Sequence, residues 1–124
     1  PFIIIDYLGL IRAPADAGRS SYEQVSYVAR NLKGFAKATG TAVFVIIQAS
    51  RAAKDGREEV GLDMARDSGQ IEEAVDFLLG AWRTDDPDAP AGEIKVKIAK
   101  NRQGPQREST LHFNFETLRI TEVG

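Results

Sequence analysis

The sequence contains no cysteine and no long apolar run. Because thiol groups are absent, a disulfide framework and a thiolate metal site are both excluded, and we expect an intracellular, cytoplasmic location. No apolar stretch approaches the roughly 20 residues that a membrane span requires. No basic segment precedes a short apolar stretch at the N-terminus, as it would in a signal peptide. We therefore expect a soluble chain that does not associate with a membrane.

Strong charge of either sign is also lacking. The 16 basic and 18 acidic residues give a formal net charge of -2, so DNA binding would have to come from a local cluster rather than from the overall field. Residues 94–106 form one such positively charged cluster. Its charge alone fits a solvated strand face as well as a small cationic binding site. This stretch has no acidic residue and contains Lys95, Lys97, Lys100 and Arg102.

The chain has the size and composition of one globular domain. It has 124 residues, of which 43% are hydrophobic and 27% charged, which is too apolar for a disordered protein. It begins at Pro1 inside an apolar strand pattern, without an initiator methionine. Such a beginning is typical of a segment from a longer polypeptide.

The first part of the chain predicts two strands that flank a helix. Residues 2–5 and 42–47 are continuous apolar runs, a pattern typical of strands buried on both faces of a parallel sheet. Between them, Ser20 and Glu23 have the spacing of a capping box, and Gly40 supplies a helix stop. Together these elements predict a βαβ crossover and a parallel sheet.

The middle of the chain is less regular. Residues 51–66 are rich in charge and predict a long, mobile loop. Asp67 or Ser68 is expected to cap a short helix that runs through Val75. Residues 76–82 predict a third strand.

The last third predicts strands of a different kind. Apolar and polar residues alternate in 93–98 and 110–115, which indicates half-exposed strands, and turn signals in 101–105 join them as an antiparallel hairpin. Residues 118–123 predict a final edge strand. We expect Trp82 and the phenylalanines to pack in the core rather than to stack on bases.

Polar residues follow the two predicted parallel strands. Asp6 ends the first strand and Gln48 ends the second. Ligands of open parallel sheets bind beyond the carboxyl ends of the strands. A carboxylate there can hold a magnesium ion through its water, and a neutral amide can hydrogen-bond a terminal phosphate or the attacking water. The pair suits a nucleotide site, although either residue alone is also common as a turn or solvent-facing residue.

Two further sets of residues can contact anions. Lys100 and Arg102 are two positions apart, so in an extended strand they share one face and can neutralise a phosphoryl group. The same pair can equally flank a hairpin turn for solubility. Arg66, followed by Asp67 and Gly69, opens the predicted short helix, where backbone N–H groups favour an anion such as a DNA phosphate. An ordinary helix cap would have the same sequence.

Four blocks of the sequence, 2–11, 45–51, 66–76 and 98–105, resemble the successive motifs of DnaB-type replicative DNA helicases in order and approximate spacing. The resemblance implies an α/β fold with a RecA-like P-loop NTPase core, in which a partial parallel sheet is followed by a C-terminal antiparallel hairpin. Residues 1–124 would be the C-terminal portion of a single motor domain. The implied activity is ATP- and Mg²⁺-dependent unwinding by a homo-oligomer, a hexameric ring around single-stranded DNA.

The resemblance also implies a role for each candidate residue. Asp6 matches the Walker B aspartate that organises magnesium, and Gln48 matches the glutamine that senses the γ-phosphate. Lys100 and Arg102 match the pair that reaches the neighbouring subunit's nucleotide, with Arg102 as the arginine finger.

The DNA-contacting loop of such helicases corresponds to Arg66, Asp67 and Gly69. Where the family usually has glutamate, Asp67 has a shorter carboxylate, so this contact differs from the family's pattern.

One motif of such helicases is missing from the sequence. The 124 residues contain no Gly-x-x-x-x-Gly-Lys-Ser/Thr loop, and the family's catalytic glutamate is missing with it. We expect this chain alone not to hydrolyse ATP, and we expect its parent to carry the loop roughly 100 residues or fewer upstream.

Two other interpretations remain. The chain could be a non-catalytic RecA-like remnant that binds DNA or a helicase partner, or it could belong to another RecA-superfamily ATPase, such as a recombinase or clock-type ATPase. The block 66–76 argues against the latter.

Overall fold

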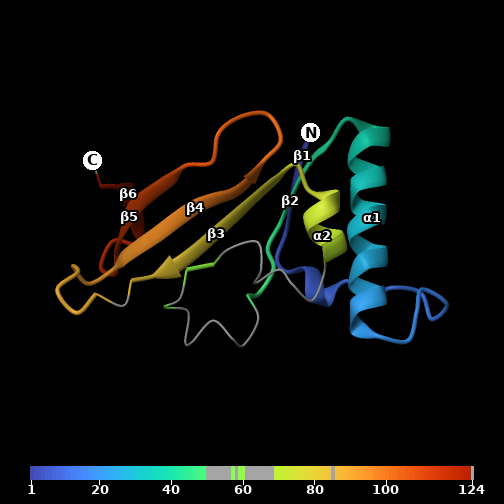
Figure 1. Cartoon of the computed structure of the whole chain (residues 1–124), viewed down its shortest axis with the longest axis horizontal. Coiled ribbons are helices and arrows are strands. Elements are labelled where there is room, and N and C mark those ends of the chain that lie inside the picture. Colours follow the sequence, from blue (N-terminus) through green and yellow to red (C-terminus); the bar gives the residue numbers. More distant parts are fainter. Residues whose placement is uncertain (50–56, 58, 61–68, 85, 124) are drawn as a thin grey trace. The chain divides into compact units, whose positions relative to one another are not determined.

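The computed structural model describes residues 1–49, 57, 59–60, 69–84 and 86–123 (Figure 1). The chain divides into two compact units. Unit 1 comprises Pro1–Gln48 and Ala65–Val75, and unit 2 comprises Ala49–Met64 and Asp76–Gly124. The assignment of residues 1–124 to one motor domain stays a prediction.

Unit 1 is built on a strand, helix, strand crossover. Strands β1 (Phe2–Ile5) and β2 (Ala42–Val45) pair in parallel, and helix α1 (Ser21–Thr39) joins them. The parallel pairing that the sequence predicts is thus confirmed. β2 ends earlier than residue 47, but Ile46 still donates its backbone N–H to the carbonyl oxygen of Ile5, at 2.9 Å.

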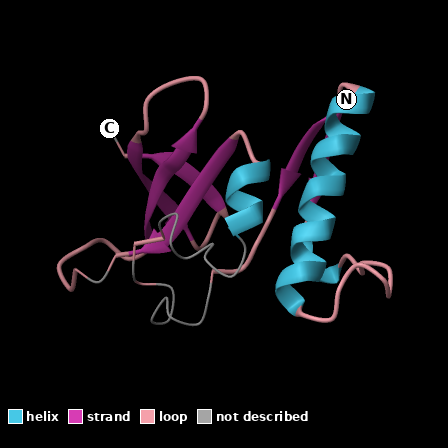
Figure 2. Ribbon diagram, turned by 45° about the vertical axis from the view of Figure 1, so that its right-hand side comes forward, coloured by secondary structure: helices cyan, strands magenta, loops and turns pink. Residues whose placement is uncertain are grey.

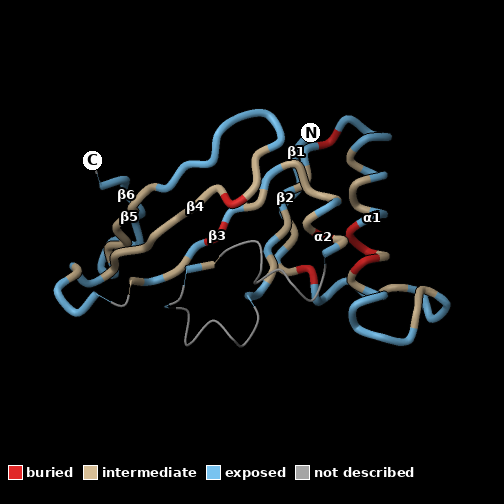
Figure 3. The backbone as a smooth tube through the Cα atoms, viewed as in Figure 1, coloured by how far each residue is buried: buried red, intermediate tan, exposed pale blue. Residues whose placement is uncertain are grey.

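The core of unit 1 lies where α1, the short helix α2 (Gly69–Ala74) and the 3-10 helix η1 (Leu8–Leu10) meet one side of the sheet. The buried stretches of α1 are red in Figure 3. Val45 and Ile47 pack against this core; as alternate residues of an extended chain they point to the same side. The buried side chains of the cluster are Leu8, Val28, Ala29 and Ile71.

The other side of the sheet is open. Phe2, Ile4 and Phe44 keep 63%, 62% and 46% of their surface accessible. The prediction that both strands are buried on both faces is therefore wrong for this chain. The reason is that the described residues of unit 1 form a sheet of two strands, and their buried cluster gathers on the opposite side.

Unit 2 is a four-stranded antiparallel sheet with the strand order β3-β4-β5-β6 (Figure 2). Its strands are β3 (Phe77–Arg83), β4 (Glu93–Asn101), β5 (Glu108–Asn114) and β6 (Arg119–Glu122). The predicted hairpin of β4 and β5 and the final edge strand β6 are confirmed. The third predicted strand, β3, joins this same sheet rather than the parallel one.

The aromatic side chains are more exposed than the sequence predicts. Phe35, Phe77 and Phe115 are 44%, 48% and 65% exposed, so their predicted place in the core is wrong, as it is for Phe2 and Phe44. They lie on surfaces that the described residues of the chain leave uncovered. Trp82 of β3 is partly buried.

A glycine of β3 allows the backbone of Val60 to lie against the sheet of unit 2. A Cβ atom added at Gly80 would come within 2.0 Å of the carbonyl oxygen of Val60. Beside it, Lys97 of β4 forms an ion pair with Glu59. The hydrogen bond that the Lys97 ammonium donates to this carboxylate raises the pKa of Lys97 above its usual range. Apart from residues 57, 59 and 60, the predicted loop 51–66 lies outside the described residues.

Local signals fix both ends of α1. The hydroxyl oxygen of Ser20 accepts the backbone N–H of Glu23 at 3.1 Å, and the Glu23 carboxylate accepts the backbone N–H of Ser20 at 2.9 Å. Gly40 ends the helix with φ 63° and ψ 27°, a left-handed conformation that glycine adopts without strain. The predicted capping box and helix stop are confirmed.

We predict that Ser20→Ala destabilises the start of α1 by about 1 kcal/mol, because one helix N–H loses its acceptor. Amide hydrogen exchange in the protein that contains this chain should become faster at Glu23. Ser21→Ala, one position later, is the matched control and should leave this exchange nearly unchanged. Equal effects of the two substitutions would contradict the capping role.

The same cap gives the helix a pH dependence. Three hydrogen bonds lower the pKa of the Glu23 carboxylate. The largest effect comes from the backbone N–H of Ser20, followed by the Ser20 hydroxyl and the backbone N–H of Arg19. Because the folded pKa lies below the ordinary glutamate value, the stabilisation is present above that ordinary value. This stabilisation is lost as the pH falls through the lowered pKa of Glu23 in the folded chain.

Candidate functional site

Asp6 and Gln48 lie at the same edge of the parallel sheet. Asp6 directly follows β1, and Gln48 follows β2 by three residues. The two exits are tied together, because Leu8 donates its backbone N–H to the carbonyl oxygen of Ile46 at 2.9 Å. Both side chains are exposed, and the peptide bond between Asp6 and Tyr7 is cis. A carboxylate and an amide are therefore available to a ligand at this edge.

A lone carboxylate such as that of Asp6 suits magnesium better than it suits a metal ion whose ligands all come from the protein. Among the residues that the structure describes, no group of three or more His, Cys, Asp or Glu side chains comes together to hold a metal ion. Magnesium keeps several waters and binds through one or two carboxylates plus the phosphates of a nucleotide. A single exposed carboxylate fits that requirement.

Lys100 and Arg102 lie at the end of β4 in unit 2. Lys100 pairs with Leu78 of β3, and β4 ends at Asn101, so Arg102 is the first residue beyond the strand. The extended geometry that would put both cations on one face therefore stops before Arg102. The backbone N–H of Arg102 donates to the carbonyl oxygen of Asp76 at 3.0 Å. The Arg102 Nη1 lies 3.5 Å from the Asp76 Oδ1.

The turn after β4 is held by the side chain of Asn101, a role that sequence reasoning missed. The Asn101 Oδ1 accepts the backbone N–H of Gln103 at 3.0 Å, and its Nδ2 donates to the carbonyl oxygen of Pro105 at 3.1 Å. The Gln106 side chain donates to the carbonyl oxygen of Ala99 at 2.8 Å, which closes the base of the loop. Asparagine three residues before a turn glycine is the available signal, since its amide mimics a backbone turn.

Only part of the predicted DNA-contacting block is described. Arg66 and Asp67 lie outside the described residues, as does Ser68, which was one of the two predicted helix caps. Gly69 is the first residue of α2 and is exposed, while Ile71 anchors the helix in the core of unit 1.

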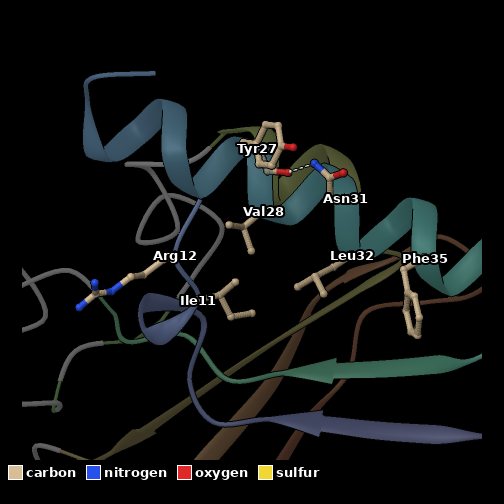
Figure 4. A pocket seen from close by; sticks show the side chains of 7 residues that line it. All are labelled: Ile11, Arg12, Tyr27, Val28, Asn31, Leu32 and Phe35. Atoms are coloured by element: carbon tan, nitrogen blue, oxygen red, sulfur yellow. Dashed lines mark hydrogen bonds between the residues drawn. The ribbon is translucent and has the colours of Figure 1, made fainter. Parts of the chain in front are cut away.

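A shallow groove of about 390 Å³ lies beside α1, between it and the residues after η1 (Figure 4). Its walls are largely apolar: Ile11, Val28 and Leu32 point towards one another, while Arg12 extends away. The Asn31 side chain is already partly engaged, because its Nδ2 donates a hydrogen bond to the carbonyl oxygen of Tyr27 at 2.8 Å. The groove includes none of the residues predicted to bind nucleotide or DNA.

Residues 1–122 match the family described as the DnaB-like helicase C terminal domain. The chain belongs to this family. The DnaB-like resemblance seen in the four sequence blocks is confirmed. No helix among the described residues is long and apolar enough to cross a membrane.

Curated relatives of the DnaB-like family match nearly the whole chain. The replicative DNA helicase DnaB of Mycoplasma genitalium is 31% identical over 124 residues, covering 93% of this chain and 26% of the relative. DnaB of Haemophilus influenzae is 32% identical and covers 98% of this chain. A probable plasmid replicative DNA helicase of Chlamydia psittaci is 33% identical and covers 96%. The chain spans about a quarter of the length of these relatives, 26% in each case.

Two solved structures have the same fold. One is described as a DnaB-like replicative helicase and its interactions with primase; its TM-score is 0.87 at 29% identity, over 99% of this chain and 30% of that one. The other is the ATPase domain of G40P, with a TM-score of 0.86 at 30% identity, over 99% of this chain and 44% of that one. The predicted α/β, RecA-like fold is confirmed.

We predict that Asn101→Ala loosens the turn that follows Lys100. Each lost hydrogen bond should cost about 1 kcal/mol, and the amide of Gln103 should exchange faster because it has lost its acceptor. Hydrogen exchange on the protein that contains this chain measures the effect. Gln103→Ala changes a side chain in the same turn and leaves both bonds in place, so it is the control. Unchanged exchange at residue 103 in Asn101→Ala would disprove the role of this amide.

Proposed function

We propose that the chain is part of an ATP-driven replicative DNA helicase motor, which couples hydrolysis to movement along single-stranded DNA and to unwinding of the duplex. One observation carries the proposal. Parallel pairing of β1 and β2 brings Asp6 and Gln48 to the same sheet edge, where ligands of open α/β sheets bind. Membership of the DnaB-like family supports the same reading.

Asp6 and Gln48 serve the bound nucleotide in different ways. The exposed carboxylate of Asp6 holds magnesium, directly or through its water, and bound magnesium neutralises charge on the phosphates. The Gln48 amide is neutral and offers both a donor and an acceptor. It can therefore hydrogen-bond the terminal phosphate or orient the attacking water without repelling either.

Lys100 and Arg102 act on the nucleotide of the neighbouring subunit in a homo-oligomer, which we propose to be a hexameric ring. Their two positive charges offset the charge that develops on the transferred phosphoryl group. Arg102 is the arginine finger, and its half-exposed side chain is accessible to a partner. Lys100 pairs with Leu78 near the end of β4, so its backbone position is fixed, and it adds a second cation.

Single-stranded DNA binds to Arg66, Asp67 and Gly69 in this proposal. The arginine contributes charge, and the exposed backbone at the start of α2 contributes N–H donors to a phosphate. The 124 residues contain no Gly-x-x-x-x-Gly-Lys-Ser/Thr loop, so the activity requires such a loop from elsewhere in the protein. The variants are therefore made in the protein that contains this chain.

We predict that Arg102→Ala lowers DNA-stimulated ATP turnover by ~10³-fold or more, because an arginine finger contributes that much to the rate. Nucleotide affinity should change little, since the finger acts mainly on the transition state. Steady-state ATPase with and without single-stranded DNA, together with nucleotide binding, measures both. Arg107→Ala removes an exposed cation from the same loop and should retain turnover. A wild-type protein without DNA-stimulated turnover, or full turnover in Arg102→Ala, would overturn the proposed function.

We predict that Arg66→Ala weakens single-stranded DNA binding and lowers the slope of log affinity against log salt by ~0.7, the value for one lost phosphate contact. DNA binding titrations at several salt concentrations measure this slope. Arg119→Ala removes an exposed cation from β6 and should leave the slope unchanged. An Arg66→Ala slope equal to that of the wild type would exclude a phosphate contact.

A further inference from the structure

Strand β4 contains a β-bulge two residues before its end. In its pairing with β3, Ile98 lies opposite Leu79, whereas Lys100 lies opposite Leu78. β4 therefore advances by two residues where β3 advances by one, and Ala99 is the extra residue. All of these residues belong to unit 2.

The bulge decides to which face of the sheet Lys100 points. Residues opposite each other in an antiparallel pair point to the same face, and successive residues of a strand alternate. Leu78 and Gly80 therefore share one face, and so do their partners Lys100 and Lys97. In an uninterrupted strand Lys100 would instead share the face of Ile98, because the two residues are two positions apart.

The face that Lys100 joins is the charged face of β4. There Lys95 forms an ion pair with Glu93 at 3.2 Å, and Lys97 forms one with Glu59. The opposite face of β4 carries the apolar side chains of Ile94, Val96 and Ile98. Because an ammonium group loses hydration among apolar side chains, the bulge places Lys100 on the face that suits its charge.

The side chain of Gln106 holds the bulged residue. The pairing of β4 with β5 extends to Ile98, whose backbone N–H donates to the carbonyl oxygen of Arg107 at 2.7 Å. Ala99 follows Ile98 and Gln106 precedes Arg107, so the next contact across the hairpin joins Ala99 to Gln106. This contact is a hydrogen bond from the Gln106 Nε2 to the Ala99 carbonyl oxygen, at 2.8 Å.

The bond between Gln106 and Ala99 is protected from water. It is partly buried, and Ala99 is only 4% exposed. A hydrogen bond in such a place is electrostatically stronger than one at the surface, and a carbonyl group that loses its donor there is costly. The Gln106 amide therefore stabilises the backbone conformation of the bulge.

We propose that Gln106 is a positioning residue for Lys100: its amide fixes the bulge at Ala99, and the bulge directs the lysine to the charged face. The inference rests on the proposed function, in which Lys100 offsets charge on the neighbouring subunit's nucleotide. Lysine is a point charge on a flexible stem, so its reach depends on the direction in which its backbone starts. Gln106 itself acts only through the backbone of Ala99.

The first test is Gln106→Met in the protein that contains this chain, because methionine has a similar length and no N–H donor. We expect DNA-stimulated ATP turnover to fall about tenfold, within the ~10²-fold that a misplacement of ~1 Å can cost. Nucleotide affinity should change little, because Lys100 acts mainly on the transition state. Gln103→Met makes the same change in the exposed turn and should match the wild type.

Two results of this test would overturn the positioning role. One is wild-type turnover in Gln106→Met. The other is an equal loss of turnover and of nucleotide affinity, which indicates a general structural defect.

A double-mutant cycle decides whether Gln106 acts through Lys100. Lys100→Ala alone should lower turnover, measured by single-turnover phosphate release. In that background Gln106→Met should cause no further loss, since the charge that it directs is gone. An equal loss in both backgrounds would exclude the positioning role and leave the helicase proposal intact. Full turnover in Lys100→Ala would instead remove Lys100 from the proposed function, and the role of Gln106 with it.

Discussion

The parallel register of β1 and β2 is the constraint on which the nucleotide site depends. Ile5 lies opposite Val45, so both strands leave the sheet at one edge, and the residues that follow them face the same solvent region. A slip of one residue would turn Val45 away from the core and would bring Phe44 towards it, since successive side chains alternate. The apolar core against α1 therefore also fixes the neighbourhood of Asp6 and Gln48.

Elements with local signals were predictable from the sequence. The capping box of Ser20 and Glu23 and the left-handed Gly40 involve residues close in the chain, so α1 followed from spacing alone. The alternation in β4 and β5 reflects a sheet with two unlike faces, and it predicted their hairpin. The edge position of Asp6 and Gln48 also followed, because parallel strands leave a sheet on one side.

Features that depend on distant residues were not predictable. An apolar run such as β1 has the same sequence whether its second face is covered or open, so the exposure of Phe2 and Ile4 had no signal. The approach of Val60 to Gly80 joins residues far apart in the chain, and so does the contact of Asp76 with Arg102. The roles of Arg66 and Asp67 rest on family resemblance, and those two residues lie outside the described part of the chain.

The division into two units has a spectroscopic consequence. The single tryptophan, Trp82, belongs to unit 2, whereas the three tyrosines, Tyr7, Tyr22 and Tyr27, all belong to unit 1. Indole emission therefore follows the antiparallel sheet, and phenol signals follow the crossover and its helix. An unfolding transition recorded with both chromophores distinguishes a chain that melts as one cooperative body from a chain whose halves melt separately.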